Sequence, residues 1–282
     1  MISTIFVDGN VYTLLGKQRS GATVYRGSEE YLRLGSSEAI ATDLRIHRAM
    51  EKAKFPVARI QKVGTYEDKS YFVEKSLGTA SFRALFQKDM EERSAISRVN
   101  FKKFLAVTSR FFKAQCAATE SVWSPDEFAS GINLPQLCKE LPSHAVAIRN
   151  RFAHAVRKIA ALPSALTHGD LNPANMYGGG VIDLEDSFAG PLGYDVISSI
   201  VSIEWSPQMR DHEFHAQYRF TDSEKAEYFS MIDTIAAKHV RELSHVKNEL
   251  AFCRAVWLCV GMGEWPKIQQ WRFEKFVKEY LS

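Results

Sequence analysis

One stretch of the sequence decides how the rest is interpreted: His168-Gly169-Asp170-Leu171-Asn172-Pro173-Ala174-Asn175, followed by Met176-Tyr177-Gly178-Gly179-Gly180 and then by Val181-Ile182-Asp183-Leu184-Glu185-Asp186. It combines closely spaced carboxylates and amides with a run of glycines. The helical spacing of apolar residues on either side is lost between Thr167 and Asp195. We therefore interpret the stretch as a tight loop followed by a short hairpin that turns at the glycines.

An Asp and an Asn five residues apart on a tight loop can converge on one point, and a hairpin can return a second Asp to the same place. In that arrangement Asp170 can accept the proton of an attacking hydroxyl group. Asn175 and Asp183 carry the oxygen ligands that Mg²⁺ prefers, and Mg²⁺ takes further ligands from substrate phosphates. A loop Asp, a loop Asn and a second Asp on the metal are the parts that kinases use.

The stretch resembles the signature of the aminoglycoside phosphotransferase/choline kinase family, in which His-Gly-Asp-x-x-x-x-Asn precedes a short hairpin, Ile-Asp-x-x-Asp and a Gly-x-x-x-Tyr-Asp-like sequence. The last of these is Gly190-Pro191-Leu192-Gly193-Tyr194-Asp195 in this chain. The resemblance implies that Asp170 is the catalytic base, that Asn175 and Asp183 bind the metal, and that Asp195 anchors the start of a helix. The resemblance also implies an α+β, two-lobed, protein-kinase-like fold. It implies ATP or GTP together with Mg²⁺ as the cofactors.

The sequence pattern of the N-terminal part of the chain predicts a small antiparallel sheet with one helix. The helix is predicted over Ser37–Ala53, which has one apolar stripe and is followed by Pro56. Asp8-Gly9 between two alternating runs is a hairpin signal. Five short runs predict strands: Thr4–Val7, Val11–Leu14, Thr23–Tyr25, Tyr31–Leu34 and Ser70–Val73.

After Leu77-Gly78 the pattern becomes mainly helical. The clearest helices are predicted over Phe101–Ala118, His144–Leu162, Ser223–Arg241, Val246–Val260 and Trp271–Tyr280. We expect an N-lobe over residues 1–75 and a C-lobe over 76–282, with the catalytic loop at 167–195 and helices that bind the acceptor after it.

The N-lobe carries a candidate nucleotide site. The loop from Gly16 to Arg26 resembles the family's phosphate-covering loop, with Ser20 and Gly21 at its turn, although a plain hairpin is an alternative for this segment alone. The resemblance also implies that backbone groups from Glu74 to Ser76 bind adenine.

One position departs from the family pattern. The family has a lysine in its third strand that holds the phosphates and pairs with a helix glutamate, whereas this chain has Arg33 there. The helix carboxylate falls near Asp43, so we expect an Arg33–Asp43 pair, or else that Arg33 is an ordinary strand residue. Arginine is not a neutral replacement for lysine, because its planar fork presents different donors.

Composition limits the kinds of partner and the cellular location that we expect for this protein. The net charge of +3 is too small to imply a nucleic-acid or membrane partner. No apolar run approaches the ~20 residues of a membrane helix, and the N-terminus lacks a signal-peptide pattern. The four cysteines show no Cys-x-x-Cys pair, so we expect reduced thiols in a cytoplasmic protein that is a monomer or a dimer.

The acceptor is expected among the C-terminal helices. Residues 195–282 hold 13 acidic and 11 basic side chains, which is too faintly acidic to favour a strongly polycationic acceptor. The candidates for lining its pocket are Glu204, Trp205, Asp211 and Trp265.

Together these features predict an ATP- and Mg²⁺-dependent kinase that phosphorylates a hydroxyl of a small molecule such as an amino sugar, an antibiotic or an amino alcohol. The alternative is a nucleotide-binding pseudokinase with a regulatory role, suggested by Arg33 and by Gln18 in place of a loop glycine. A protein kinase is less favoured, because Ile182-Asp183-Leu184-Glu185 stands where protein kinases have Asp-Phe-Gly.

Overall fold

The N-terminal residues form a six-stranded antiparallel sheet in the computed structural model, which describes residues 4–17, 21–120, 122–207, 218–240, 243–261 and 265–282. The strand order is β1-β2-β3-β4-β6-β5. All five predicted strands are present. The sixth, β5, lies at an edge with most of its side chains exposed and therefore lacks the apolar alternation that identifies a strand in the sequence. The strands are β1 (Thr4–Val7), β2 (Asn10–Lys17), β3 (Thr23–Arg26), β4 (Glu30–Gly35), β5 (Ile60–Tyr66) and β6 (Lys69–Lys75).

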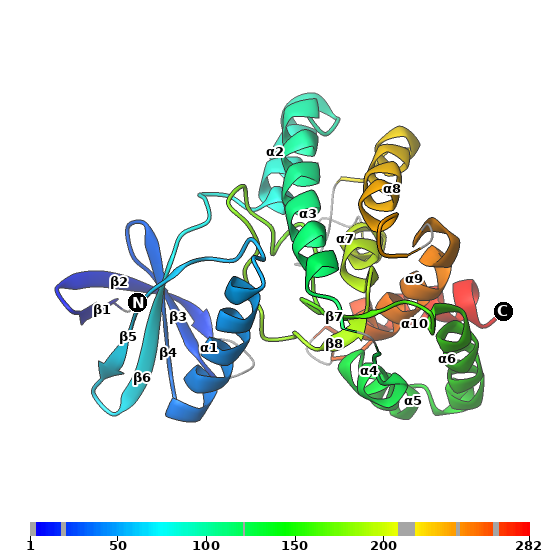
Figure 1. The fold of residues 1–282 in the computed structure, drawn as a ribbon, viewed down its shortest axis with the longest axis horizontal. Coiled ribbons are helices and arrows are strands. Elements are labelled where there is room, and N and C mark those ends of the chain that lie inside the picture. Colours follow the sequence, from blue (N-terminus) through cyan, green and yellow to red (C-terminus); the bar gives the residue numbers. More distant parts are fainter. Residues whose placement is uncertain (1–3, 18–20, 121, 208–217, 241–242, 262–264) are drawn as a thin grey trace.

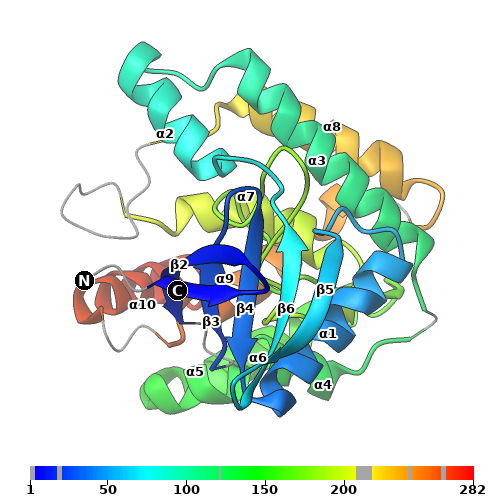
Figure 2. The same ribbon diagram turned by 90° about the vertical axis from the view of Figure 1, so that its left-hand side faces the viewer.

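Helix α1 (Ser37–Lys52) covers one face of this sheet (Figure 2). Its start is capped by the Ser36 hydroxyl, which accepts a hydrogen bond from the Ala39 N–H. Ile40 and Leu44 on its apolar stripe pack against Phe72 of β6. The opposite face of the sheet has a core of its own, made by Val7, Tyr12, Leu32, Leu34, Tyr71 and Val73.

The rest of the chain is mainly helical, as the sequence predicts. Helix α10 begins earlier than expected, at Pro266, because proline suits the first turn of a helix. The elements are α2 (Phe82–Arg93), α3 (Arg98–Ala117), α4 (Pro125–Gly131), α5 (Leu134–Glu140), α6 (Ala145–Ile159), β7 (Ser164–Leu166), β8 (Ala189–Pro191), α7 (Tyr194–Glu204), α8 (Asp222–Ala236), α9 (Lys247–Leu258) and α10 (Pro266–Tyr280), with short 3-10 helices at Pro142–His144 and Leu243–Val246.

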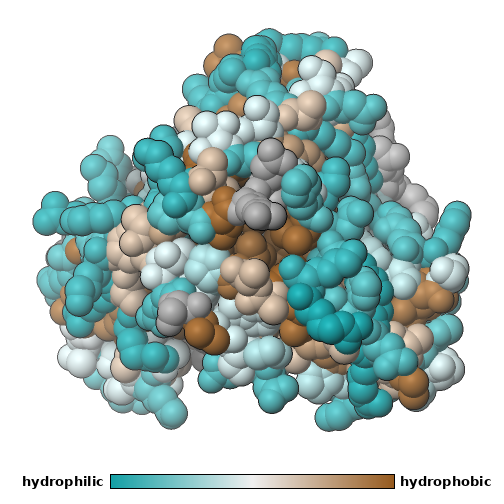
Figure 3. Space-filling view, turned by 45° about the vertical axis from the view of Figure 1, so that its right-hand side comes forward, coloured by the Kyte–Doolittle hydropathy of each residue, from teal (hydrophilic) through white to brown (hydrophobic). Residues whose placement is uncertain are grey.

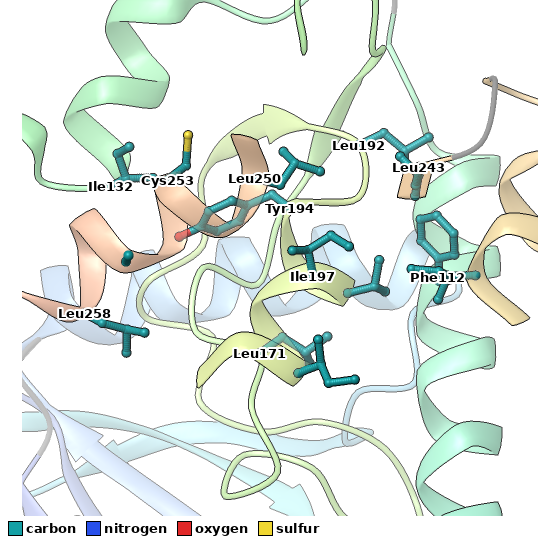
Figure 4. Packing of buried hydrophobic residues seen from close by; sticks show 14 of the residues in the cluster. Phe112, Ile132, Leu171, Leu192, Tyr194, Ile197, Leu243, Leu250, Cys253 and Leu258 are labelled. Atoms are coloured by element: carbon teal, nitrogen blue, oxygen red, sulfur yellow. The ribbon is translucent and has the colours of Figure 1, made fainter. Parts of the chain in front are cut away.

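Figure 1 shows the sheet and α1 at one side of the molecule and the later helices at the other, which gives the α+β kinase-like architecture. The helices share one large core (Figure 4), in which Leu171 of the loop that follows His168, Ile197 of α7 and Leu250 of α9 take part. The face of the molecule in Figure 3 is largely hydrophilic, with a hydrophobic area near its centre. None of the described helices is long and apolar enough to cross a bilayer.

The glycine-rich hairpin joins the two sides. The Gly179 N–H donates to Leu77 O at 2.8 Å, and the Val181 N–H donates to Pro56 O at 2.8 Å. A Cβ atom on Gly180 would lie 1.8 Å from Pro56 O, so the close approach of the two backbones requires glycine. The dense glycines therefore place the hairpin against the chain segments that follow β6 and α1.

All four cysteines are buried free thiols, as expected. Burial raises the pKa of Cys116 to about 12. Burial also raises the pKa of Cys253 and Cys259, and a buried thiol with a raised pKa is a poor nucleophile.

Candidate active site

Asp195 anchors the start of the loop that carries Asp170. It lies in the first turn of α7 and is fully buried. Its carboxylate accepts hydrogen bonds from the His168 N–H at 2.9 Å, the Gly169 N–H at 3.1 Å and Gln115 Nε2 at 2.8 Å. Burial raises the pKa of Asp195, and these donors oppose the rise by stabilising the charged form.

Gly169 is required at the turn that follows. Its φ of +81° is in the left-handed region, and an added Cβ atom would lie 1.9 Å from Asp186 O. This tight turn presents the next residue, Asp170, at the surface of the loop.

Asp170 and Asn175 contact each other across the loop, as their spacing predicts. Asn175 Nδ2 donates to Asp170 Oδ2 at 3.1 Å and to Asp170 O at 3.0 Å. Asn172 makes the turn between them, because its side-chain oxygen accepts from the Ala174 N–H at 2.8 Å.

The hairpin returns Asp183 to the same place. The Ile182 N–H donates to Asn175 O at 3.0 Å, and Ile182 O contacts His168 Nε2 at 2.8 Å. Asp183, the next residue, has a φ of +66°, in the left-handed region that Asp tolerates better than most other residues. The three residues predicted for catalysis and metal binding therefore lie together.

The donor set fits a magnesium ion. Asn175 and Asp183 contribute side-chain oxygens, the ligand type that Mg²⁺ takes together with nucleotide phosphates. No group of three or more His, Cys, Asp or Glu side chains in the described parts of the chain could hold a metal ion without such added ligands.

Arg254 of α9 is a component that the sequence argument missed. It is fully buried, and its Nη2 forms an ion pair with Asp170 Oδ1. Its Nη1 donates to Gly169 O at 2.9 Å and its Nε donates to Ser202 Oγ at 2.9 Å. Burial acts to lower the pKa of Arg254, but the Asp170 carboxylate outweighs it and holds the pKa above its ordinary value. Arg254 therefore fixes one oxygen of Asp170.

A cavity of about 150 Å³ lies where the nucleotide is expected. Its apolar walls come from β2, β3 and the hairpin, and include Leu15, Val24 and Ile182. Arg33 and Glu74 contribute the charged part of its lining.

The expected pairing of Arg33 with Asp43 is wrong. Arg33 Nε instead donates to Glu74 Oε1 at 2.9 Å, in a buried ion pair. Phe72 lies opposite Arg33 in the β4–β6 register, so Glu74, two residues further along β6, presents its side chain on the same face and within diagonal reach. Burial acts to lower the pKa of Arg33, but Glu74 and Asp183 keep it above its ordinary value.

Helix α1 contributes a histidine to this pair. His47 Nδ1 lies 3.6 Å from Glu74 Oε2, and its Nε2 contacts Ala58 O. Asp43, one turn earlier, has a buried Oδ2 without a hydrogen-bond partner. Burial raises the pKa of Asp43, the charge of Arg33 lowers it, and Glu185 adds to the rise.

The remaining residues of the predicted nucleotide site are placed as follows. The Lys75 N–H donates to Arg59 O at 3.0 Å, and the Ser76 N–H donates to Glu29 O at 2.8 Å. These two amides are therefore already used within the protein. Gly21 has a φ of +88° just before β3, and Ser20 lies outside the described residues.

A larger cavity, of about 430 Å³, opens beside Asp170 and Asn175 and is the candidate acceptor site. Of the residues predicted to line it, Trp265 does so. Trp205 does not, because it is buried in the core and stacks on Tyr280. Glu204 forms an ion pair with Lys225 and is not among the described lining residues.

The other walls come from α2, α7, α9 and α10, and Asp211 lies outside the described residues. The described lining residues are Arg83, Asp170, Asn172, Pro173, Ala174, Asn175, Ser202, Ile203, Ser206, Tyr218, Arg254, Trp257, Leu258, Val260, Gly261, Trp265 and Arg272.

Two of these, Arg254 and Arg272, carried a signal in the sequence. Each lies at a core position of its helix, with buried apolar residues four positions before and after it. An arginine inside an apolar stripe is rare unless it has a buried role. Helical periodicity could therefore have identified both.

A kinase-like sheet, a loop Asp beside a loop Asn and a returning Asp define the class of phosphotransferases with a protein-kinase-like fold. The sequence profile of the phosphotransferase enzyme family (APH) matches residues 12–231, and the chain belongs to this family. No curated protein matches the sequence.

Several solved structures share this fold. A choline/ethanolamine kinase family protein from Mesorhizobium loti has a TM-score of 0.58 at 14% identity, over 94% of this chain and 87% of that one. A thermostable mutant of aminoglycoside phosphotransferase APH(4)-Ia, in a ternary complex with AMP-PNP and hygromycin B, has a TM-score of 0.55 at 15% identity, over 95% and 93%. Aminoglycoside phosphotransferase APH(3'')-Id from Streptomyces rimosus has a TM-score of 0.54 at 14% identity, over 88% of this chain and 92% of that one.

Proposed function

We propose that this protein is a kinase that transfers the γ-phosphoryl group of ATP or GTP to a hydroxyl group of a small molecule. The observation that carries the proposal is that Asp170 and Asn175 lie together at the wall of a cavity large enough for such an acceptor, while the hairpin pairs Ile182, the neighbour of Asp183, with Asn175. The similar structure that was solved with AMP-PNP and hygromycin B supports a nucleotide and a small molecule as the two substrates.

Asp170 acts on the acceptor in this proposal. Arg254 and Asn175 each hold one of its carboxylate oxygens, so the group is oriented before the acceptor arrives. It then positions the acceptor hydroxyl and takes its proton as the new O–P bond forms and the bond between the γ-phosphorus and the oxygen of the departing nucleoside diphosphate breaks.

The nucleotide phosphates would be held by the residues on the other side of Asp170. Asn175 and Asp183 would bind Mg²⁺, which when present neutralises charge on the phosphates. Arg33 lies within electrostatic range of Asp183 and supplies a further positive charge there. Leu15, Val24 and Ile182 offer apolar walls for the base.

One observation favours a second candidate function. The guanidinium of Arg33 is paired with Glu74, a carboxylate of the nucleotide cavity itself, instead of a residue of α1. A protein with its phosphate-binding cation neutralised in this way could bind a nucleotide without turning it over, as a regulatory pseudokinase does.

The test is phosphate transfer by the wild type, Asp170→Asn and Asp183→Asn to a panel of amino sugars, amino alcohols, nucleosides and antibiotics. Asp170→Asn keeps an oxygen for Arg254 but cannot take a proton, so kcat is expected to fall at least ~10²-fold with unchanged nucleotide affinity. Asp183→Asn is expected to lose Mg²⁺-dependent turnover.

Asp222→Asn is the matched control, because Asp222 is exposed in the first turn of α8. Transfer by Asp170→Asn at the wild-type rate would refute the role of the base. Tight nucleotide binding by a wild type that phosphorylates no acceptor would favour the pseudokinase.

A further inference from the structure

The acceptor cavity has an unusual charge balance. The charged side chains among its described lining residues are three arginines, Arg83, Arg254 and Arg272, against the single carboxylate of Asp170. That carboxylate is already paired with Arg254. Arg272 therefore adds a positive charge that no carboxylate in the described part of the wall offsets, and such a charge favours an anionic acceptor over a polycationic one.

Arg272 of α10 is the part of this wall that lacks a counter-charge. It is 6% exposed, and none of the described carboxylates forms an ion pair with it. Its Nε donates to Trp205 O at 3.1 Å and its Nη1 donates to Leu258 O at 2.5 Å. Both acceptors are neutral carbonyls, and among the described residues Nη2 has no partner.

Trp205 O and Leu258 O lie at the C-terminal ends of α7 and α9, where the helix dipoles stabilise a cation, but no described carboxylate forms an ion pair with Arg272. Burial lowers the pKa of Arg272 to about 10; the charge of Arg254 adds to the fall, whereas Cys259 and Asp170 oppose it, so the group is still charged at neutral pH. The two carbonyls fix its plane, and the side chain borders an open cavity. This is a preformed binding position for an anionic oxygen.

The rest of the wall adds flat apolar surface. Trp257, Trp265 and Tyr218 line the cavity, and the ring of Trp257 lies 4.1 Å from the guanidinium carbon of Arg254. Such surfaces suit the ring of a sugar or an aromatic compound. Asp170 stands at the same cavity as Arg272, so a hydroxyl and an anionic group of one molecule can reach both.

We propose that the acceptor is an anionic hydroxyl compound, with a carboxylate or phosphate group that binds Arg272 while its hydroxyl lies at Asp170. This inference rests on the proposed function, and it specifies the substrate class of the same site. It separates this chain from a phosphotransferase that acts on polycationic antibiotics.

The test uses four hexoses that differ only at C6: glucuronate, glucose 6-phosphate, glucuronamide and 6-amino-6-deoxyglucose. Calorimetric binding to the full chain, with and without ATP and Mg²⁺, needs no turnover. We expect one or both anionic sugars to bind at least about tenfold more tightly than the amide, and the amine to bind most weakly. The first two sugars distinguish a carboxylate from a phosphate.

Arg272→Gln is expected to weaken binding of the anionic sugar about 10- to 100-fold and to change binding of the amide less than about twofold. Arg272→Lys keeps the charge and is expected to restore part of the preference, which a purely structural role would not do. Lys278→Gln removes one charge from the exposed side of the same helix and is the matched control. Nucleotide affinity and melting temperature verify that each variant is folded.

Equal affinities for the four sugars, no binding of either anionic sugar, or a preference for the amine would overturn the inference. If Arg272→Gln does not fold, the affinities of the wild type for the four sugars and the measurements on Arg272→Lys still test the inference. Anion binding that depends on Arg272 in a protein without phosphate transfer would mean that only the proposed function fails. Transfer confined to neutral or cationic acceptors would mean that only this inference fails.

Discussion

Replacing Asp195 with alanine is expected to destabilise the protein strongly, although the residue touches no substrate. The change leaves three buried donors without their acceptor: the N–H groups of His168 and Gly169 and the amide of Gln115. Each unsatisfied buried group costs ~1–3 kcal/mol. Taking the lower half of that range, because water can enter the space left by the carboxylate, the loss is about 4 kcal/mol in total.

That loss is a large part of the ~5–15 kcal/mol that stabilises a typical domain. At ~2–4 °C per kcal/mol for a chain of this size, the melting temperature should fall by about 8–16 °C. Circular dichroism melting curves of the wild type and Asp195→Ala measure this directly. Turnover should fall as well, because the loop that carries Asp170 loses its anchor.

The matched control is Asp222→Ala, which removes an exposed carboxylate from the first turn of α8. It should cost at most ~1 kcal/mol through the helix dipole. Gln115→Leu combined with Asp195→Ala should cost less than the sum of the single changes, because both remove the same hydrogen bond. A melting temperature for Asp195→Ala within about 3 °C of the wild type, or equal to that of Asp222→Ala, would refute the reasoning.

Two further predictions concern ion pairs. Arg33→Ala should weaken nucleotide binding about tenfold, whereas Glu74→Gln should tighten it about tenfold by releasing Arg33 for the phosphates. Calorimetry measures both affinities, and equal weakening by the two variants would contradict the assignment of Arg33 as a phosphate-binding residue. Glu227 accepts from Arg98 and Lys102, which lower its carboxyl pKa to about 2, so its stabilisation exists above the ordinary value of 4.5 and disappears as the pH falls towards 2. The melting temperature of Glu227→Gln should therefore lie below that of the wild type at pH 7 and equal it near pH 2. A difference in melting temperature that is independent of pH would contradict this prediction.

Local patterns accounted for the strands, for α1 and for the meeting of Asp170, Asn175 and Asp183. Hairpin turns, apolar stripes and a spacing of five residues are all properties of short segments. The edge strand β5 was missed because its exposed side chains carry no apolar alternation. Trp205 was misplaced because an aromatic residue suits a core and a binding cavity equally well, and only its packing on Tyr280 distinguishes the two.

The sequence by itself determined the class of this protein and brought the three candidate site residues together, because those residues lie within fourteen positions of one another on a loop and its hairpin. Only the tertiary structure decided which charges meet. Arg33 pairs with Glu74 across 41 residues because the sheet register brings them to one face, and Arg254 reaches Asp170 across 84 residues because α9 packs beside the loop. Arg272 has no such partner among the described carboxylates, and its position at the cavity depends on how α10 packs. Electrostatic energy depends on distances in space, which the order of residues along the chain does not specify.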